Sequence, residues 1–147
     1  MSVIPSFDSD TGNLPRGIHE ASWDEVKARF GGTPWRQHLL EGLEQALTQF
    51  AKAGCTSVLL DGSFVTAKAE PNDYDGAWEP DGVDLDLLDP VLLDFSNSRA
   101  AMKRKYGGEM FPTSSMAAPG KVFREFFQQD RQGRVKGIIQ IDPRDIK

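Results

Sequence analysis

The segment VLLDGSFVTAKAEPNDYDGAW, residues 58–78, contains two predicted β-strands separated by a polar loop. The first, residues 57–60, is a short apolar run typical of a buried strand. The second, residues 73–79, includes bulky aromatic residues that favour strands. Between them, residues 63–67 predict a short helix and residues 70–72 predict a turn. The loop therefore returns the chain to the end of the first strand.

Asp73 and Asp75 are the most informative residues of the second strand. Side chains two apart on a strand project from the same face, so the two carboxylates lie together. They repel by about 1 kcal/mol at 4 Å even in water, and a hard divalent cation such as Mg²⁺ or Mn²⁺ relieves this repulsion. Such ions assist phosphoryl and nucleotidyl transfer. Ordinary turn chemistry is the alternative explanation, because Asn-Asp follows a proline here.

Gly62 and Ser63, at the end of the first strand, are candidates for binding phosphate. A glycine allows a sharp turn and a close approach to a ligand. The serine hydroxyl and the free amides at the start of a helix favour anions. Lys68, within the loop, is a candidate point charge for the same phosphates. Together these residues predict a phosphate site that faces the metal-binding aspartates.

The combination of Leu59–Ser63 with Asp73-Tyr74-Asp75 resembles the signature of the nucleotidyltransferase superfamily with the polymerase-β-like fold, in its minimal Gly-Ser…Asp-x-Asp form. The chain departs from the common pattern at Gly76-Ala77, where many relatives carry a large aliphatic residue. A wider resemblance, over roughly residues 14–145, is to a small uncharacterised bacterial family. It is carried by the segments DGSFVTAK, PNDYDGAW, LLDF, KYGGEMFP, FFQQDRQGR and KGIIQID.

The resemblance implies a nucleotidyltransferase-like mixed sheet flanked by helices, within the α/β (α+β) class that the interleaved strands and helices themselves indicate, with about four strands expected. It also implies a third catalytic carboxylate on a neighbouring strand. Asp142 is the first choice, because it ends the apolar strand 137–141. Glu109, beside the short strand 110–111, is the competing choice.

The rest of the chain predicts an irregular N-terminal arm, residues 1–21, followed by a single domain, residues 22–147. Ser22 and Glu25 form a capping box, and Thr33-Pro34 begins a long amphipathic helix that ends at Gly54. Further helices are expected at 98–106 and 119–129, and further strands at 109–111 and 135–142.

Composition limits the class of protein. The 147 residues carry 17 basic and 22 acidic side chains, a net charge of -5, which argues against a surface devoted to nucleic acid. The single cysteine, Cys55, excludes an internal disulfide and suits a reducing compartment. We find no signal peptide and no apolar run long enough to cross a bilayer. A cytoplasmic protein without a membrane partner is expected.

Several other patterns have simpler explanations. Asp84 and Asp86 repeat the Asp-x-Asp spacing but lack an upstream Gly-Ser turn, so a solvated loop is favoured. The glycine and glutamate spacing of an EF-hand is absent, as are Walker and dinucleotide motifs. His19 and His38 lack zinc-ligand spacing. The basic residues of segment 103–106, and Arg131 with Arg134, suit either a wet surface or a nucleic-acid contact.

Two functions follow from these observations. The first is a metal-dependent nucleotidyltransferase that moves a nucleoside monophosphate from a nucleoside triphosphate to a hydroxyl of a protein, an RNA or a small molecule. In it Asp73, Asp75 and Asp142 would bind metal, and Gly62, Ser63 and Lys68 would bind the nucleotide. The alternative is a catalytically weak binding module of the same fold, such as a toxin–antitoxin or phage-defence partner. It is suggested by the shortness of the chain, which shows no separate substrate domain.

Overall fold

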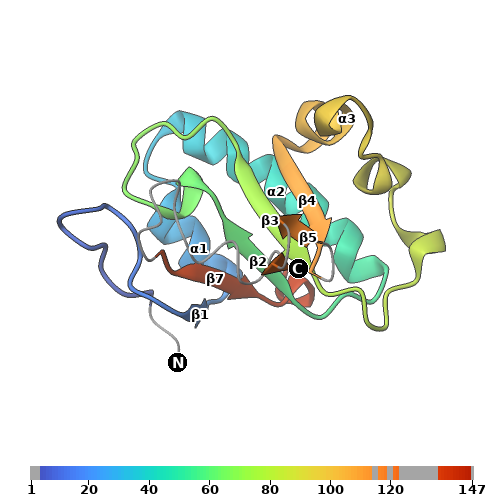
Figure 1. Ribbon diagram of the computed structural model, residues 1–147, viewed down its shortest axis with the longest axis horizontal. Coiled ribbons are helices and arrows are strands. Elements are labelled where there is room, and N and C mark those ends of the chain that lie inside the picture. Colours follow the sequence, from blue (N-terminus) through green and yellow to red (C-terminus); the bar gives the residue numbers. More distant parts are fainter. Residues whose placement is uncertain (1–3, 114–115, 119–120, 123–135, 147) are drawn as a thin grey trace.

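A computed structural model describes residues 4–113, 116–118, 121–122 and 136–146. Its centre is a five-stranded mixed sheet with the strand order β1-β7-β2-β3-β4 (Figure 1). Together with helices α1, α2 and α3, this sheet confirms the predicted α+β class, with five strands in the main sheet rather than four.

The two N-terminal helices begin where their caps were predicted. Helix α1 spans Trp23–Phe30, and Ser22 and Glu25 form the reciprocal capping box. Helix α2 spans Pro34–Lys52, and the Thr33 side chain accepts a hydrogen bond from the Arg36 amide. These caps satisfy amide groups that a helix leaves without partners in its first turn, which fixes where each helix starts.

The strands of the central sheet run in both directions. Strand β2, Val58–Asp61, pairs antiparallel with β3, Tyr74–Trp78, and on its other side antiparallel with β7, Ile138–Ile141. Strand β4, Gly108–Pro112, pairs parallel with β3. Gly76 lies where a Cβ atom would come within 2.3 Å of the Met110 sulfur, so close packing of β3 against its neighbours explains the departure from a large aliphatic residue.

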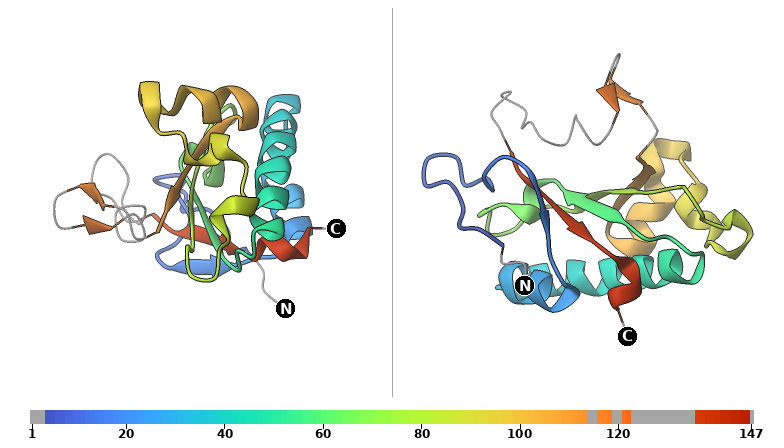
Figure 2. Two further views of the ribbon diagram at one scale, coloured as in Figure 1. Left: turned by 90° about the vertical axis from the view of Figure 1, so that its right-hand side faces the viewer. Right: turned by 90° about the horizontal axis from the view of Figure 1, so that it is seen from below.

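Helices α1 and α2 cover one face of the sheet (Figure 2). The main core lies between these helices and the sheet and includes Leu43, Leu47, Phe50, Val58, Leu60 and Trp78. Leu59, Ala77 and Ile138 form a separate buried cluster, as expected for side chains that alternate to the other face. The β5–β6 hairpin, Met116–Ala118 and Lys121–Val122, lies on that second side (Figure 2).

The N-terminal segment is more ordered than an irregular arm. Ile18–Glu20 form β1, a parallel edge strand beside β7. Ile4 and Leu14 are buried in the core, and the Gly137 amide donates to the Leu14 carbonyl. Proline, glycine and polar residues hid this strand in the sequence, because a three-residue edge strand is specified by its neighbour rather than by its own pattern.

Helix α3, Ser96–Tyr106, lies against the edge strand β4 (Figure 1). Asn97, Ser98 and Arg99 have left-handed backbone angles, with φ of 50°, 54° and 61°, so its regular part starts after Arg99. Gly107, at φ 82°, ends the helix. The Tyr74 hydroxyl donates to the Tyr106 carbonyl and ties β3 to the end of this helix.

Four 3₁₀ turns lie among the described residues: Ser63–Val65, Leu85–Leu87, Pro90–Leu93 and Pro143–Asp145. The short helix expected at 63–67 is therefore only one such turn. Asp84 and Asp86 are exposed, and the Asp84 side chain accepts from the Asp86 amide, which agrees with a solvated loop.

Some expectations concern residues outside the described ranges. They include most of the helix expected at 119–129, the first residue of the strand expected at 135–142, and Arg131 and Arg134; the described strand β7 begins only at Ile138. Lys121 and Val122, within that expected helix, belong to strand β6 instead. Among the described residues, no helix has the length and apolar character needed to cross a membrane.

Candidate active site: a carboxylate cluster at one end of the sheet

Four acidic side chains meet where β2 ends and β3 and β4 begin. The register pairs Asp61 with Asp75, and Asp75 with Glu109, across three neighbouring strands. Paired residues on adjacent strands project from the same face, and Asp73 precedes Asp75 by two positions on that face. We call Asp61, Asp73, Asp75 and Glu109 the carboxylate cluster. It lies on the face of the sheet opposite α2. Asp61 and Asp75 share that face with Leu59 and Ala77, whereas Leu60 points toward the helices.

The carboxylate cluster concentrates negative charge. Burial, followed by the charges of Asp73, Asp61 and Glu109, raises the pKa of Asp75 from its ordinary 3.8 to about 7. Burial and the charge of Glu109 also raise the pKa of Asp73. Among the described residues, the Asp73 and Asp75 side chains have no hydrogen-bond or ion-pair partner. These two carboxylates therefore lack a cation of their own.

Asp61 has a different environment, because Lys136 lies against it. The Lys136 ammonium is 2.8 Å from Asp61 Oδ1, and the two side chains are only 11% and 5% exposed. Burial raises the pKa of Asp61, and Lys136 opposes that shift. The two opposite charges form an ion pair beside Asp75. Neither Asp61 nor Lys136 was among the site residues predicted from sequence.

Glu109 is held by two cations from α3. Lys103 Nζ lies 2.8 Å from Glu109 Oε1, and Arg99 Nη2 lies 3.4 Å from the same oxygen. Lys103 also acts on Asp73, where its charge lowers the pKa against the larger effect of burial. Two cations of the predicted basic helix, Arg99 and Lys103, therefore lie at the carboxylate cluster.

Gly62 joins the two halves of the sequence motif directly. Its φ of 85° and ψ of -177° fall in a region that side chains do not tolerate, and a Cβ atom here would be 2.9 Å from Asp75 Oδ2. Only glycine therefore fits against the Asp75 carboxylate. Ser63 is exposed beside it, but its 3₁₀ turn of three residues offers no helix N-terminus of the kind predicted.

Lys68 is also exposed, and its hydrogen bonds to the described residues involve only its backbone. Its amide donates to Thr66 Oγ1, and its carbonyl accepts from Arg36. Arg36, which is buried, also donates to the carbonyls of Phe30, Phe64 and Thr66. Arg36 therefore holds the loop after β2 in place.

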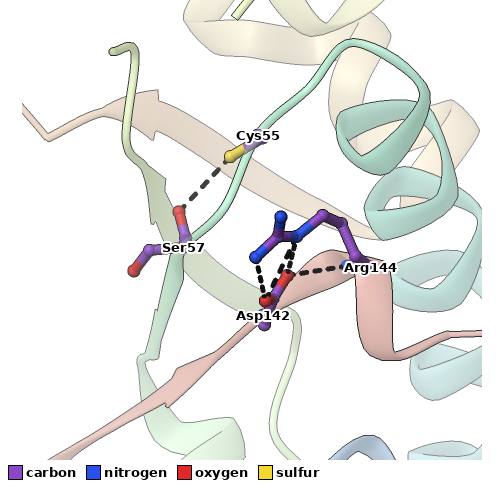
Figure 3. A network of polar contacts seen from close by, with 4 residues as sticks. All are labelled: Cys55, Ser57, Asp142 and Arg144. Carbon is purple, nitrogen blue, oxygen red and sulfur yellow. Dashed lines mark hydrogen bonds and ion pairs between the residues drawn. The ribbon is translucent and has the colours of Figure 1, made fainter. Parts of the chain in front are cut away.

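Asp142 lies at the opposite end of the sheet. Strand β7 is antiparallel to β2 and Ile141 pairs with Val58, so Asp142 lies beside Ser57. Ser57 is four residues before Asp61 along β2, which separates Asp142 from Asp61 by roughly 13 Å. Its carboxylate binds the Arg144 side chain and amide (Figure 3). The expectation that Asp142 completes the site with Asp73 and Asp75 does not fit this geometry. Glu109, the competing choice, is the one that lies with them.

The donor set can be compared with the needs of a metal ion. Among the described residues, no group of three or more His, Cys, Asp or Glu side chains is arranged to hold one. Mg²⁺ in nucleotide enzymes is often bound by one or two carboxylates together with substrate phosphates and water. Asp73 and Asp75, two adjacent carboxylates without a cation, fit that smaller requirement.

Some site residues had only weak signals in the sequence. Asp61 stands inside the quoted motif but reads as the polar end of a strand, and Lys136 is one lysine in a polar stretch. Arg99 and Lys103 belong to a helix whose charges have the ordinary explanation of solvation. Their roles emerge only from strand order, which brings distant segments to one end of the sheet.

The fold and the carboxylate cluster define the chain as a small α+β protein with an acidic candidate site at the ends of adjacent strands. Over residues 5–142 it matches a family of unknown function, DUF6932, and it belongs to that family. A search of curated proteins gave no match, and a search of solved structures gave none.

Proposed function

We propose that this protein is a metal-dependent nucleotidyltransferase with a nucleotidyltransferase-like fold, whose reaction takes place at the carboxylate cluster. The observation that carries the proposal is the meeting of Asp73, Asp75 and Glu109 with Gly62 at one end of the sheet. The Gly-Ser and Asp-x-Asp halves of the motif are in contact there, through Gly62 and Asp75.

Each residue has a defined role in this proposal. Asp73 and Asp75 hold Mg²⁺ or Mn²⁺, which supplies charge stabilisation for the phosphates. Gly62 lets the backbone pass close to the Asp75 carboxylate, because it has no side chain. Ser63 offers an exposed hydroxyl at the rim. Glu109, rather than Asp142, is the third carboxylate.

The transfer joins an acceptor hydroxyl to the α-phosphorus of a nucleoside triphosphate. A new P–O bond forms there, the bond to the β-phosphate breaks, pyrophosphate leaves, and the acceptor proton passes to water. The acceptor is a hydroxyl of a protein, an RNA or a small molecule. Lys136 pairs with Asp61, and its charge offsets part of the negative charge around Asp75.

A second candidate is a binding module of the same fold with weak or absent catalysis, such as a toxin–antitoxin or phage-defence partner. One observation favours it: Lys136 already neutralises Asp61, and Arg99 and Lys103 already neutralise Glu109. Lysine and arginine side chains that neutralise acidic residues can take the place of a metal ion, and the protein then keeps its fold but has no catalytic activity.

Labelled nucleotides distinguish the two. The purified protein is incubated with α-labelled ATP, GTP, CTP or UTP, Mg²⁺ and cell extract or total RNA, and transfer of label is measured. We expect transfer by the wild type and a loss of at least about 100-fold in Asp73→Asn and Asp75→Asn. Asp86→Asn, which has the same spacing in an exposed loop, is the matched control and should retain activity. Full activity in both site variants would reject the site, and no transfer to any acceptor would favour the binding module.

A further inference from the structure

Helix α3 brings positive charge to the carboxylate cluster from the β4 side. Arg99 and Lys103 both approach Glu109 Oε1, and their side chains remain 33% and 41% exposed. They are therefore accessible to a ligand at the surface. Gly62 and Ser63 lie on the other side of β3, so Asp73 and Asp75 stand between these two residues on one flank and two cations on the other.

An aromatic surface continues from these cations. The Arg99 guanidinium lies 5.4 Å from the centre of the Phe111 ring. Phe111 follows Glu109 by two positions on β4 and stacks on Phe95, with ring centres 6.0 Å apart and an angle of 12° between the planes. Phe95 is 43% exposed, which is unusual for a phenylalanine in a domain of this size.

We propose that the nucleotide lies along this edge, with its phosphates bound by Arg99 and Lys103 and its base stacked on the exposed ring of Phe95. The inference rests on the proposed function and adds the residues that bind the substrate. Arginine and lysine are the usual partners of phosphate, and exposed aromatic rings bind bases of any identity by stacking. Lys68, the cation expected from sequence, has no comparable position.

The same contacts imply an exchange of partners. Arg99 and Lys103 neutralise Glu109. Phosphate oxygens compete with the Glu109 carboxylate for these cations, so nucleotide binding frees Glu109 to act with Asp73 and Asp75.

An acidic peptide could use the same cations, but it would not require a flat exposed ring. Calorimetry with ATP and with inorganic triphosphate, both with Mg²⁺, separates the two ligands. We expect the wild type to bind ATP roughly 5- to 100-fold more tightly than triphosphate, because only ATP has a base to stack. Phe95→Leu should weaken ATP binding to the level of triphosphate and leave triphosphate binding unchanged.

The cations are tested with matched variants. Arg99→Gln with Lys103→Gln should weaken both ligands at least about 10-fold. Arg104→Gln, on the same helix but outside the cluster, and Leu87→Ala, an exposed apolar residue elsewhere, should have no effect. Melting temperatures check that each variant is folded. If Phe95→Leu binds ATP like the wild type, or if Arg104→Gln weakens binding as much as the double variant, the inference is overturned.

The outcomes separate the inference from the proposed function. ATP binding that depends on Phe95 and Arg99, without any transfer of label, would support this nucleotide site and reject the transferase. Transfer with an unchanged KM for ATP in Phe95→Leu would support the transferase and reject this placement of the nucleotide.

Discussion

The two ends of the antiparallel pair β2–β7 carry acidic residues in opposite states. At one end, Asp142 is paired with Arg144 across an exposed surface, and hydrogen bonds from Arg144 lower the pKa of its carboxyl group (Figure 3). At the other end, Asp75 is surrounded by Asp61, Asp73 and Glu109, and its pKa is raised to about 7. Both are acids at the end of a strand, yet only one is electrostatically unsatisfied.

The difference shows how a candidate functional site can be recognised in this fold. A structural carboxylate such as Asp142 is satisfied locally, by its own turn and a neighbouring arginine. The carboxylate cluster instead combines groups from separate strands, and among the described residues Asp73 and Asp75 form no direct ion pair, although the charges of Lys103 and Lys136 act on them. Strained electrostatics of this kind costs stability and is typical of sites that bind a charged ligand.

The largest effect on stability is expected at the buried ion pair. Lys136→Met leaves the Asp61 carboxylate buried without its cation, which should lower the free energy of unfolding by about 3–5 kcal/mol at pH 8. The loss should shrink toward pH 4, since Asp61 can then fold in its protonated form. Chemical denaturation at several pH values measures both effects.

The double variant Asp61→Asn with Lys136→Met is the control for that prediction. Removal of both charges should recover most of the lost stability, because no unpaired charge is then buried. A Lys136→Met protein as stable as the wild type would show that Asp61 is not held as described.

A substitution at Gly62 tests the contact between Gly62 and Asp75, which joins the two halves of the motif. Gly62→Ala should lower the free energy of unfolding by about 1–3 kcal/mol through its backbone angles, and its methyl group should displace the Asp75 carboxylate. Gly82→Ala is the matched control, since Gly82 has φ of 80° and no atom within 4 Å of an added Cβ. Nucleotide transfer should fall in Gly62→Ala but not in Gly82→Ala; equal losses would indicate strain alone.

The smallest effect is expected at the other end of the sheet. Arg144→Gln removes an exposed ion pair, and such pairs contribute little to stability. Its melting temperature and its nucleotide transfer should match the wild type within experimental error. A loss of transfer would move the functional site toward Asp142.

Local signals in the sequence predicted the local structure. The caps at Ser22 and Thr33 and the apolar run before Asp61 specify elements through neighbouring residues, and the structure confirms them. The pairing of Gly62 with Asp75 also follows from one motif within one hairpin.

Long-range pairing could not be obtained in the same way. The choice between Asp142 and Glu109 depends on the direction in which β7 and β4 run beside their neighbours. The sequence of neither strand specifies that direction. Strand β4 is parallel to β3, so its first residues lie at the carboxylate cluster. Strand β7 is antiparallel to β2, so the residue after its end lies at the opposite end of the sheet. The same limitation hid the contact of Lys136 with Asp61.

The central claim is that Asp73 and Asp75 form a cation site that is unsatisfied without its ligand. Its most direct test is the free energy of unfolding of the wild type and Asp75→Asn at pH 8, with EDTA and with Mg²⁺. A carboxyl group whose pKa rises from 3.8 to about 7 on folding destabilises the fold once it is ionised, by as much as about 4 kcal/mol above pH 7, and by nothing below its unfolded pKa. Asp75→Asn should therefore be more stable than the wild type in EDTA at pH 8, with an advantage that disappears toward pH 4, and Mg²⁺ should stabilise the wild type more than the variant. A wild type that is as stable as Asp75→Asn in EDTA and unaffected by Mg²⁺ would contradict this account.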